Sequence, residues 1–521
     1  MSLQEQRLGV VATKPPWHGP RAMVAALSLG MTLAIVAIFA ANLTDWTPSA
    51  VIALPLVALT AIWISGGAAL ALLGYFLPPP YSAKVPAHWR PNSRSAILVT
   101  LCKEDPQPVA AYLESLHDGL ERCGLSEATE IFVLSDTSGA GLVAREEAAL
   151  LCRQDAGVLT YRRRGNNLGR KPGNIGEWVD THGARFDHML ILDADSRITP
   201  GRIARMIWHM ERTPDLGLLQ AGIGLLRGRT RFGRHQRIAS RLLTRGFGRG
   251  FAAWSGESGN FWGHNAIVRV AAFRVARTLP EFPGNAPWGG MILSHDFVEA
   301  AWIRRAGWAV ALDPETTGSA EAAPQTIAEF HARDRRWCQG NLQHIRLLTE
   351  PGLDPVSRMH LIMGVLSYLV APIWLIVVAL VALGDVPVAG GLPLAVVAGV
   401  LLMPKLCALF DRWQAARTAR RRAVMLRASL GELALSTVIA PLVMLRQTGA
   451  VIAVCLGRDC GWKSSQGARW RLRPGLGEAS VGWSLVALAI PAAGPSAIWL
   501  VPVALPLCFA PLIIRMLDAP A

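Results

Sequence analysis

The segment His188-Met-Leu-Ile-Leu-Asp-Ala-Asp-Ser196 joins a short apolar run to two carboxylates, Asp193 and Asp195, that stand one residue apart. A strand directs alternate side chains to the same face, so these carboxylates would project together from its end. Open α/β sheets bind ligands at the carboxyl ends of their strands. Two hard oxygen ligands suit Mg²⁺ or Mn²⁺ that carries a diphosphate. A strand end followed by ordinary turn residues would look the same, so the surrounding sequence has to decide.

Two earlier segments repeat the pattern of an apolar strand that ends in polar residues. Residues 95–101 have the composition of a buried strand and lead into Glu104, and residues 130–134 form a second such strand that leads into Asp136. Residues 108–123 between them have a helical pattern, and this alternation predicts a parallel sheet with crossover helices. Three consecutive parallel strands would bring carboxylates to one edge, which favours a nucleotide site over three unrelated turns.

Two loops carry further candidate residues. Lys171 stands in a glycine-containing loop, residues 166–174, where the backbone could approach a ligand closely and the lysine could meet a phosphate. A solvated basic loop is the alternative. His264 and Asn265 stand in a loop of small residues that could shape an acceptor pocket, although a lone histidine in such a loop is more often structural.

Ser294, His295 and Asp296 begin a predicted helix. Ser294 or Asp296 could cap its N-terminus. Alternatively, Asp296 could act as a general base, which requires a carboxylate close to the substrate.

The motif Arg333-Asp-Arg-Arg-Trp-Cys-Gln-Gly-Asn341 precedes an apolar segment of membrane length. Its arginines and Trp337 could anchor the chain at the surface of an anionic membrane. Alternatively, Arg333 and Arg336 could clamp a diphosphate beside Trp337, on which a sugar ring could stack.

The composition is that of a membrane protein with a substantial polar part. Of 521 residues, 51% are hydrophobic and 17% charged, and the formal net charge is +15. No nucleic-acid-binding motif accompanies this charge, so nucleic acid is not expected as a partner. Arginines that face anionic lipid explain the charge.

Apolar segments of membrane length lie on both sides of the polar middle. The links within each pair of segments lack Lys and Arg, whereas the outer flanks are basic, which places the N-terminus and the polar domain in the cytoplasm. Residues 431–456 are interrupted by Glu432, Pro441 and Arg446 and have basic flanks on both sides. This pattern favours an interfacial or re-entrant segment, with a short membrane hairpin as the alternative.

The expected organisation has six spans, or eight with the hairpin. It consists of a cytosolic N-terminus (1–22), two transmembrane helices (23–77), a cytosolic domain (91–350), two transmembrane helices (360–411), interfacial or re-entrant helices (412–457), a cytosolic basic loop (458–476) and two transmembrane helices (478–517).

In their order along the chain, these motifs resemble those of the processive family 2 glycosyltransferases, which include cellulose and hyaluronan synthases. The phrases LDADS, FWGHNAIVR, ILSHDFVEAAWIRRAGW and RDRRWCQGNLQ are similar to those of the glucans biosynthesis glucosyltransferase H family, which makes the backbone of osmoregulated periplasmic glucans. The resemblance covers about residues 95–380 closely and the other helices in layout. It implies an α/β cytosolic GT-A (Rossmann-like) glycosyltransferase domain inserted in an α-helical transmembrane bundle of the bacterial inner membrane.

The resemblance also implies roles for individual residues. Asp193 and Asp195 would bind UDP and its metal, Mg²⁺ or Mn²⁺, and Asp296 would deprotonate the acceptor hydroxyl. The resemblance would also place Asp136 at the nucleotide, and Arg336 and Trp337 at the diphosphate and the acceptor end. With the candidates from the strand ends, loops and helices added, the expected donor residues are Glu104, Asp136, Lys171, Asp193, Asp195, Arg333, Arg336 and Trp337, and the expected acceptor residues are Trp337, His264, Asn265 and His295. The broader superfamily has Gln at the place of Arg333. The basic loop at 458–473 occupies the place of the cellulose synthases' gating loop but lacks their motif.

The implied reaction is an inverting glucosyl transfer from UDP-glucose that extends a linear β-1,2-glucan and translocates it across the inner membrane. The partners would be the growing glucan and membrane lipids and, by the family, an acyl carrier protein and a periplasmic glucan-modifying protein. Two alternatives within the enzyme class are another family 2 synthase that forms a β-1,4-glucan and a transferase that glycosylates a lipid phosphate once. A transporter with a nucleotide-binding domain would need charged or broken helices in its spans, where Lys405 and Arg446 are among the few such residues.

Overall fold

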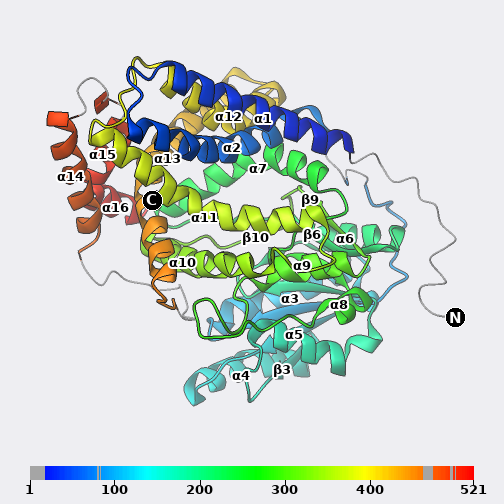
Figure 1. Cartoon of the computed structure of the whole chain (residues 1–521). Coiled ribbons are helices and arrows are strands. Elements are labelled where there is room, and N and C mark those ends of the chain that lie inside the picture. Colours follow the sequence, from blue (N-terminus) through cyan, green and yellow to red (C-terminus); the bar gives the residue numbers. More distant parts are fainter. Residues whose placement is uncertain (1–17, 79–80, 82–83, 461–472, 493–496, 499) are drawn as a thin grey trace.

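A seven-stranded sheet lies at the centre of the polar domain, and long apolar helices lie along one side of that domain (Figure 1). The computed structural model describes residues 18–521 except 79–80, 82–83, 461–472, 493–496 and 499. The strands run in the order β3-β2-β1-β4-β8-β6-β9. Their bounds are β1 (Ser95–Leu101), β2 (Thr129–Ser135), β3 (Thr160–Arg163), β4 (His188–Asp193), β6 (Leu216–Ala221), β8 (Ala266–Arg269) and β9 (Ala309–Asp313).

The three strands predicted from the sequence are confirmed as the neighbours β2, β1 and β4, which run parallel to one another. The sheet is nevertheless mixed, because β8 pairs antiparallel with both β4 and β6. The expectation of a wholly parallel sheet is therefore wrong at β8. A second, three-stranded sheet has the order β5-β10-β7 and is formed by β5 (Arg197–Ile198), β10 (Ser319–Glu321) and β7 (Gly224–Leu225).

Strand β1 is apolar throughout because both of its faces are buried. Ala96 and Leu98 belong to the hydrophobic core on one side of the sheet, whereas Ile97, Val99 and Leu101 belong to the core on the other side. Alternate side chains of a strand point to opposite faces, so a strand covered on both sides reads as a continuous apolar run.

Helices supply the other half of each core. The core on the Ile97 side contains residues of α3 (Pro106–Arg122), α4 (Ala140–Asp155) and α6 (Pro200–Arg212). The core on the Leu98 side contains residues of α5 (Arg170–Thr181), α8 (Val270–Ala276) and α9 (His295–Arg305). The chain then enters α10 (Ile327–Gln343), and single turns lie at η2 (Ser126–Ala128), η3 (Gly183–Arg185) and η4 (His344–Leu347).

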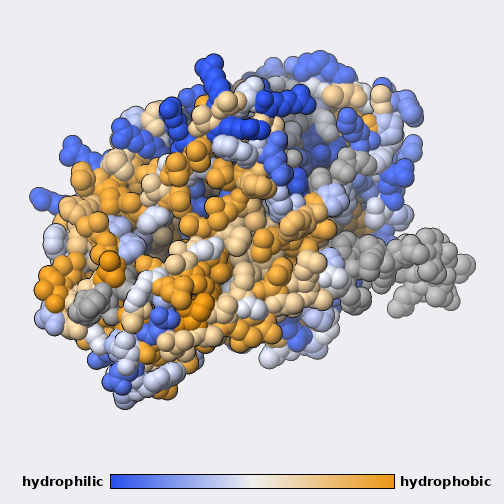
Figure 2. All heavy atoms as spheres, turned by 90° about the horizontal axis from the view of Figure 1, so that it is seen from above, coloured by the Kyte–Doolittle hydropathy of each residue, from blue (hydrophilic) through white to orange (hydrophobic). Residues whose placement is uncertain are grey.

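In the part of the chain that the structure describes, five helices are long and apolar enough to cross a membrane, by length and composition. They are α1 (His18–Ala41), α2 (Pro48–Phe76), α11 (Pro355–Ala382), α12 (Leu392–Ala415) and α13 (Ala419–Cys455). Figure 2 shows a broad apolar surface on the side of the molecule where α1, α2 and α12 lie in Figure 1.

The remaining C-terminal helices are shorter. Helix α14 (Leu476–Ala492) has 17 residues, and α15 (Val501–Cys508) and α16 (Ala510–Asp518) meet at 71° and make a sixth crossing if they act as one span. These three helices overlap residues 478–517, where the sequence predicts two transmembrane helices. The segment expected to be interfacial or re-entrant lies in α13, which is one continuous helix of 37 residues.

Helix α7 (Arg231–Ser255) joins the polar domain to the apolar helices. It crosses α2 at glycines: a Cβ on Gly74 would lie 1.8 Å from the carbonyl oxygen of Gly246, and a Cβ on Gly250 would lie 1.8 Å from that of Leu70. Small residues permit such backbone contact between helices. Arg21 of α1 adds two hydrogen bonds, each 3.0 Å long, to the carbonyls of Trp254 and Ser255 at the end of α7.

Candidate functional site

The carboxyl ends of β2, β1 and β4 meet at one edge of the sheet, as the sequence predicts. The Asp136 N–H donates to the carbonyl of Leu101 at 2.9 Å, which fixes the end of β2 to the end of β1. On the other side of β1, Thr100 pairs in register with Asp193, and its hydroxyl donates to the Asp193 carboxylate at 3.2 Å. The polar groups that follow all three strands therefore lie side by side.

Asp193 forms an ion pair with Lys171, which also donates to the carbonyl of Gly263 at 2.8 Å. Burial alone would raise the pKa of Asp193, but the charge of Lys171, with that of His264, lowers it to about 2. Asp193 is therefore ionised, and its carboxylate is paired with the ammonium group of Lys171. The lysine links this strand end to the loop that carries Gly263.

Asp195 has a different electrostatic environment. Burial, together with the charges of Asp193 and Glu321, raises its pKa to about 6. Glu104 lies in the same field, and burial, with Asp193 and Asp195 nearby, raises its pKa to about 7. No salt bridge to Asp195 is present in the described part of the chain. Repulsion between neighbouring carboxylates disfavours their ionisation, and a bound cation relieves that repulsion.

These oxygens fit a divalent cation that a diphosphate helps to bind. Among the described residues, no group of three or more His, Cys, Asp or Glu side chains could hold a metal by itself. A metal on Asp195, with Asp193 beside it, would therefore need oxygen ligands from the substrate. Mg²⁺ characteristically binds in this way, through one or two carboxylates and the phosphates of the substrate.

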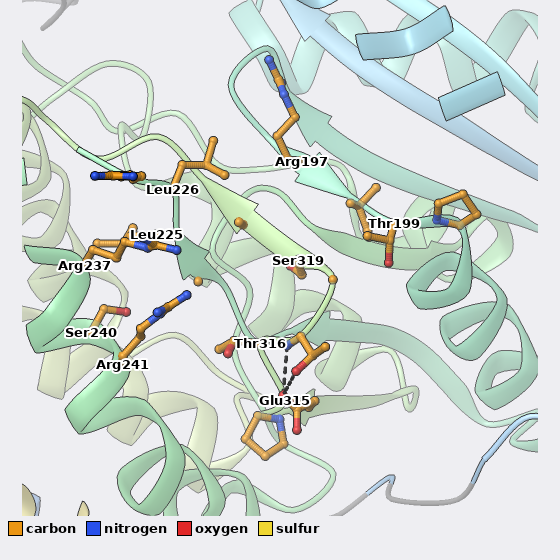
Figure 3. Close-up of a pocket in the computed structure, with 18 of the residues that line it drawn as sticks. Arg197, Thr199, Leu225, Leu226, Arg237, Ser240, Arg241, Glu315, Thr316 and Ser319 are labelled. Atoms are coloured by element: carbon orange, nitrogen blue, oxygen red, sulfur yellow. Dashed lines mark hydrogen bonds between the residues drawn. The ribbon is translucent and has the colours of Figure 1, made fainter. Parts of the chain in front are cut away.

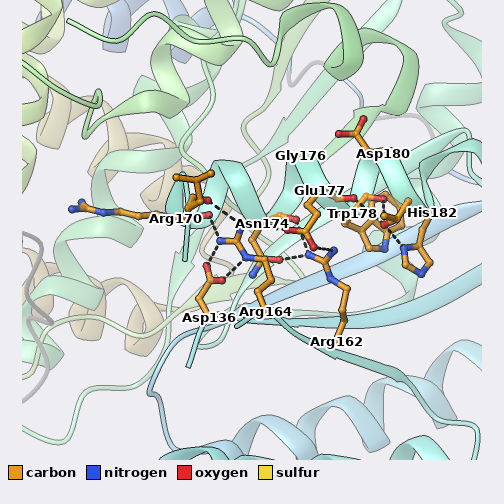
Figure 4. A network of polar contacts seen from close by, with 12 residues as sticks. Asp136, Arg162, Arg164, Arg170, Asn174, Gly176, Glu177, Trp178, Asp180 and His182 are labelled. Carbon is orange, nitrogen blue, oxygen red and sulfur yellow. Dashed lines mark hydrogen bonds and ion pairs between the residues drawn. The ribbon is translucent and has the colours of Figure 1, made fainter. Parts of the chain in front are cut away.

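Asp136 is neutralised by an arginine that the sequence analysis did not identify. Arg164 donates to both of its carboxylate oxygens, at 2.7 and 2.9 Å, and both side chains are buried (Figure 4). Arg164 also donates to the carbonyls of Leu168 and Arg170, each at 3.0 Å. The pair therefore fixes the loop that leads to Lys171. Arg164 lies in an arginine-rich run, and nothing in that run distinguishes the arginine that turns inward.

Asp296 stands in the first turn of α9, with His295 and Glu299 around it. The His295 Nδ1 atom lies 3.0 Å from Asp296 Oδ1 and 3.3 Å from Glu299 Oε1. Burial alone would lower the pKa of His295, but these two carboxylates raise it to about 10. The charged imidazole in turn outweighs the burial of Asp296 and lowers its pKa below the ordinary value. Asp296 is thus an ionised carboxylate held in place by its neighbour.

The His264 side chain is paired with Glu321 and lies in the electric field of Asp193. Burial alone would lower its pKa, but Asp193 and the Glu321 side chain raise it to about 9. As an imidazolium it donates to Glu321 at 2.7 Å and to the carbonyl of Trp262 at 3.1 Å. Glu321 was not predicted, because it stands in the three-residue strand β10, which is too short to show a periodic pattern. Asn265 is fully buried behind the loop and donates to the Ser319 hydroxyl at 2.9 Å.

Helix α10 carries Arg333, Arg336 and Trp337. The Arg333 guanidinium lies 4.5 Å from the centre of the Trp337 ring, and 47% of Trp337 is exposed. Burial lowers the pKa of Arg336, a group that stays positive even so. The exposed ring is thus available to a ligand, with the Arg333 guanidinium beside it.

Close packing fixes α10 against the start of α9. A Cβ on Gly340 would lie 2.3 Å from the Ser294 hydroxyl, and the Leu293 N–H donates to the Gln343 side chain at 3.0 Å. The motif that ends in Trp337 and the turn that carries Asp296 therefore belong to one rigid assembly.

Gln339 on the same helix holds the chain beyond α13. Its amide nitrogen donates to Asp459 at 2.7 Å, and its oxygen accepts from the Cys460 N–H at 2.8 Å. Most of the basic loop expected at 458–476 follows directly, and its residues 461–472 lie outside the described residues.

Two family models match the chain. Glycosyl transferase family 2 covers residues 96–276, which include the strand ends with Asp136, Asp193 and Asp195. Glycosyl transferase family group 2 covers residues 188–403, which extend from β4 into the apolar helices. Among solved structures, the chain is similar to the mannosyltransferase PcManGT from Pyrobaculum calidifontis in complex with GDP-Man and Mn²⁺. That match has 15% identity and a TM-score of 0.45 and covers 74% of this chain and 99% of the other.

Curated relatives named glucans biosynthesis glucosyltransferase H match over most of the chain. The relative from Bradyrhizobium diazoefficiens is 36% identical over 492 residues, which cover 85% of this chain and 65% of the relative. Relatives from Vibrio cholerae and Cereibacter sphaeroides are 37% and 36% identical; the chain spans 68% of the former and 83% of the latter. The resemblance found in the four sequence phrases is thereby confirmed, and the chain belongs to the glucans biosynthesis glucosyltransferase H family.

Proposed function

We propose that this protein is an inverting glucosyltransferase that polymerises glucose from UDP-glucose into a linear β-1,2-glucan at the cytoplasmic face of the bacterial inner membrane. One observation carries the reaction type. The ionised carboxylate of Asp296 is in contact with the loop of Gly263, whose carbonyl accepts from Lys171, the partner of Asp193. Gly263 thus contacts both the proposed base, Asp296, and Lys171 of the proposed donor site.

In the proposed step, Asp296 takes the proton of the acceptor hydroxyl, and that oxygen attacks the anomeric carbon of the donor glucose. The bond from this carbon to the diphosphate breaks on the opposite face, and UDP leaves with the electron pair. A carboxylate whose pKa is lowered is ionised at neutral pH and is therefore ready to accept the proton.

The leaving diphosphate requires positive charge. Asp195 and Asp193 would hold the divalent metal, which supplies Lewis-acid stabilisation of the diphosphate when bound. Lys171 offers a fixed ammonium to a phosphate oxygen, and Arg333 and Arg336 offer guanidinium groups from α10. Asp136, already paired with Arg164, would border the nucleoside.

The acceptor end would lie at Trp337, because the apolar face of a glucose ring can stack on an exposed indole. His295 holds Asp296 toward the acceptor, and His264 and Asn265 support the loop between donor and acceptor. The growing glucan would leave through the apolar helices that follow α10. An acyl carrier protein and a periplasmic glucan-modifying protein are proposed as partners from the family alone.

The test is synthesis from radiolabelled UDP-glucose by the purified full chain, followed by linkage analysis. Asp296→Asn should abolish polymer while UDP binding stays within about twofold of wild type, because a base contributes at least ~10²-fold to such a step. Asp118→Asn, at an exposed site on α3, is the matched control and should retain activity. Near-normal polymer from Asp296→Asn would overturn the catalytic assignment.

The product separates this function from its rivals. A β-1,2-linked polymer supports the proposal, a β-1,4-linked polymer indicates another family 2 synthase, and a single sugar on a lipid phosphate indicates a non-processive transferase.

A further inference from the structure

A large basic cavity lies outside the proposed UDP site. It encloses about 1130 Å³ between the three-stranded sheet, the start of α6, helix α7 and the end of α12. Figure 3 shows Arg237 and Arg241 of α7 on one side of the cavity and Ser319 of β10 across from them. None of the residues proposed to bind UDP or acceptor lines this cavity.

The wall of the cavity carries a large excess of positive charge. Of the described residues that line it, Glu315 alone carries a carboxylate, and one oxygen of that carboxylate accepts from the Thr317 N–H at 2.9 Å and the Thr317 hydroxyl at 2.7 Å. The arginines of the wall are Arg197, Arg227, Arg237, Arg241, Arg249 and Arg412.

Two of these arginines, Arg241 and Arg227, repel the positive charge of a third, Arg237. Arg237 and Arg241 are four residues apart on α7, and therefore lie on the same face of the helix. Burial, with the charges of Arg241 and Arg227, lowers the pKa of Arg237. In addition, the Arg237 Nε atom is buried without a hydrogen-bond partner among the described residues. A buried donor and clustered positive charge are both stabilised by an anion with several oxygens.

Arginines of the cavity wall also contact the turn with Asp195, at one end, and connect α7 to α12, at the other. The Arg197 guanidinium donates to the carbonyls of Ala194 and Ser196, at 3.2 and 2.7 Å, and so holds the turn that contains Asp195. At the opposite wall, Arg412, near the end of α12, donates to the carbonyl of Arg241. Arg412 also lines an adjoining open groove of about 610 Å³ in which Arg420 and Arg421 stand beside Val424 and Met425.

We propose that this cavity is a binding site for a phosphate group, either the headgroup of an anionic phospholipid or a free phosphate ester. Guanidinium groups match phosphate oxygens through paired hydrogen bonds, and Arg227, Arg237 and Arg241 lie near one another in the wall of this cavity. The adjoining groove has both basic and apolar residues, so a lipid could place its phosphate on the arginines and its chains beside Val424 and Met425. A soluble ester would use the arginines alone. The site stands independently of the proposed reaction, because no donor or acceptor residue contributes to it.

The test measures binding to the purified full chain in a neutral detergent. Dioctanoyl phosphatidylglycerol probes the lipid source, glycerol phosphate probes the soluble source, and dioctanoylglycerol is the probe without phosphate. In Arg237→Gln/Arg241→Gln, the affinity for the phosphate-bearing probe should fall about tenfold or more, because two charge-assisted contacts are removed. The double variant Arg145→Gln/Arg163→Gln, on α4 and β3 at the far edge of the sheet, has the same change in net charge and should bind as wild type does.

The outcomes are distinct. Binding of both phosphate probes identifies a general phosphate site, and binding of the lipid probe alone identifies a headgroup site. If wild type binds neither phosphate probe better than dioctanoylglycerol, or if the α7 variant binds within about twofold of wild type, the proposal is overturned. Arg227→Gln, at an exposed position after β7, serves if the double variant does not fold, and should weaken binding about threefold.

Discussion

Gly263 lies in direct contact with Asp296. A Cβ at position 263 would lie 2.8 Å from the Oδ2 atom of Asp296 and 2.9 Å from its carboxylate carbon, and the φ angle of Gly263 is +85°. Both the space and the backbone conformation therefore require glycine. The same residue accepts a hydrogen bond from Lys171, so it separates the proposed base from the proposed donor site by a single peptide.

Replacement of Gly263 by alanine should displace the Asp296 carboxylate and lower the turnover number by about 10²-fold, because small misplacements of a catalytic group have effects of this size. Steady-state kinetics with UDP-glucose would measure it, with UDP affinity as the second readout. Gly201→Ala is the control, since a Cβ at that position on α6 meets nothing within 4 Å, and it should retain activity. Equal activity in the two variants would contradict a catalytic position for Asp296.

The charge of His295 should stabilise the fold in a pH-dependent manner. Its folded-state pKa of about 10 lies above the ~6.5 of an unfolded histidine. The stabilisation is therefore complete below about pH 6.5 and is lost as the pH rises through about 10. His295→Gln should lose about 2 kcal/mol of unfolding free energy at pH 6 and much less at pH 10. Thermal unfolding of both proteins across this range would measure the difference, and a difference independent of pH would refute the prediction.

A buried ion pair joins two of the apolar helices. Lys405 of α12 donates to Glu432 of α13 at 2.9 Å, and only 1% of the glutamate side chain is exposed. Removal of one partner leaves an uncompensated charge, so Lys405→Met should cost about 3–5 kcal/mol of stability. In the double variant Lys405→Met/Glu432→Gln, most of this loss should be recovered. A double-mutant cycle on thermal unfolding in detergent would measure the coupling, and additive losses would rule out the interaction.

The crossing of α7 and α2 should not tolerate a methyl group. Gly250→Ala would place a Cβ 1.8 Å from the carbonyl oxygen of Leu70 and should cost about 1–3 kcal/mol, as overpacking does. On α2 itself, a Cβ at Gly66 meets nothing within 4 Å, so Gly66→Ala is the matched control and should be neutral or slightly stabilising. Comparison of the two unfolding midpoints tests whether the crossing holds the polar domain to the apolar helices.

The strand ends of the site could be predicted because each is a local pattern. β1, β2 and β4 are apolar runs that stop at polar residues, and Asp136 and Asp193 stand where those runs end. The direction of β8 could not be predicted, since a four-residue strand with three apolar residues pairs equally well in either direction until the connections are known. Arg164 and Glu321 were missed for a related reason. Their roles depend on partners 28 and 57 residues away, and no local pattern encodes such pairings.

The motif Arg333–Asn341 shows how one helix can serve two surfaces. The sequence allowed either a lipid anchor or a ligand clamp, and the structure leaves Trp337 exposed while Asp334 is buried against the hydroxyl of Tyr368 at 3.1 Å. Helical spacing alone gives the faces of α10 but not their neighbours, because α9 and the chain after α13 approach α10 from distant parts of the sequence.

The glycine contacts between α7 and α2 also have a mechanical meaning. Two helices whose backbones touch have no flexible side chains between them to absorb relative motion. A change in the tilt of α2, such as a thinner or thicker bilayer imposes, would therefore be passed to α7, which forms one wall of the arginine cavity. A bilayer around α2 would thus act as part of the frame that sets the shape of the polar domain.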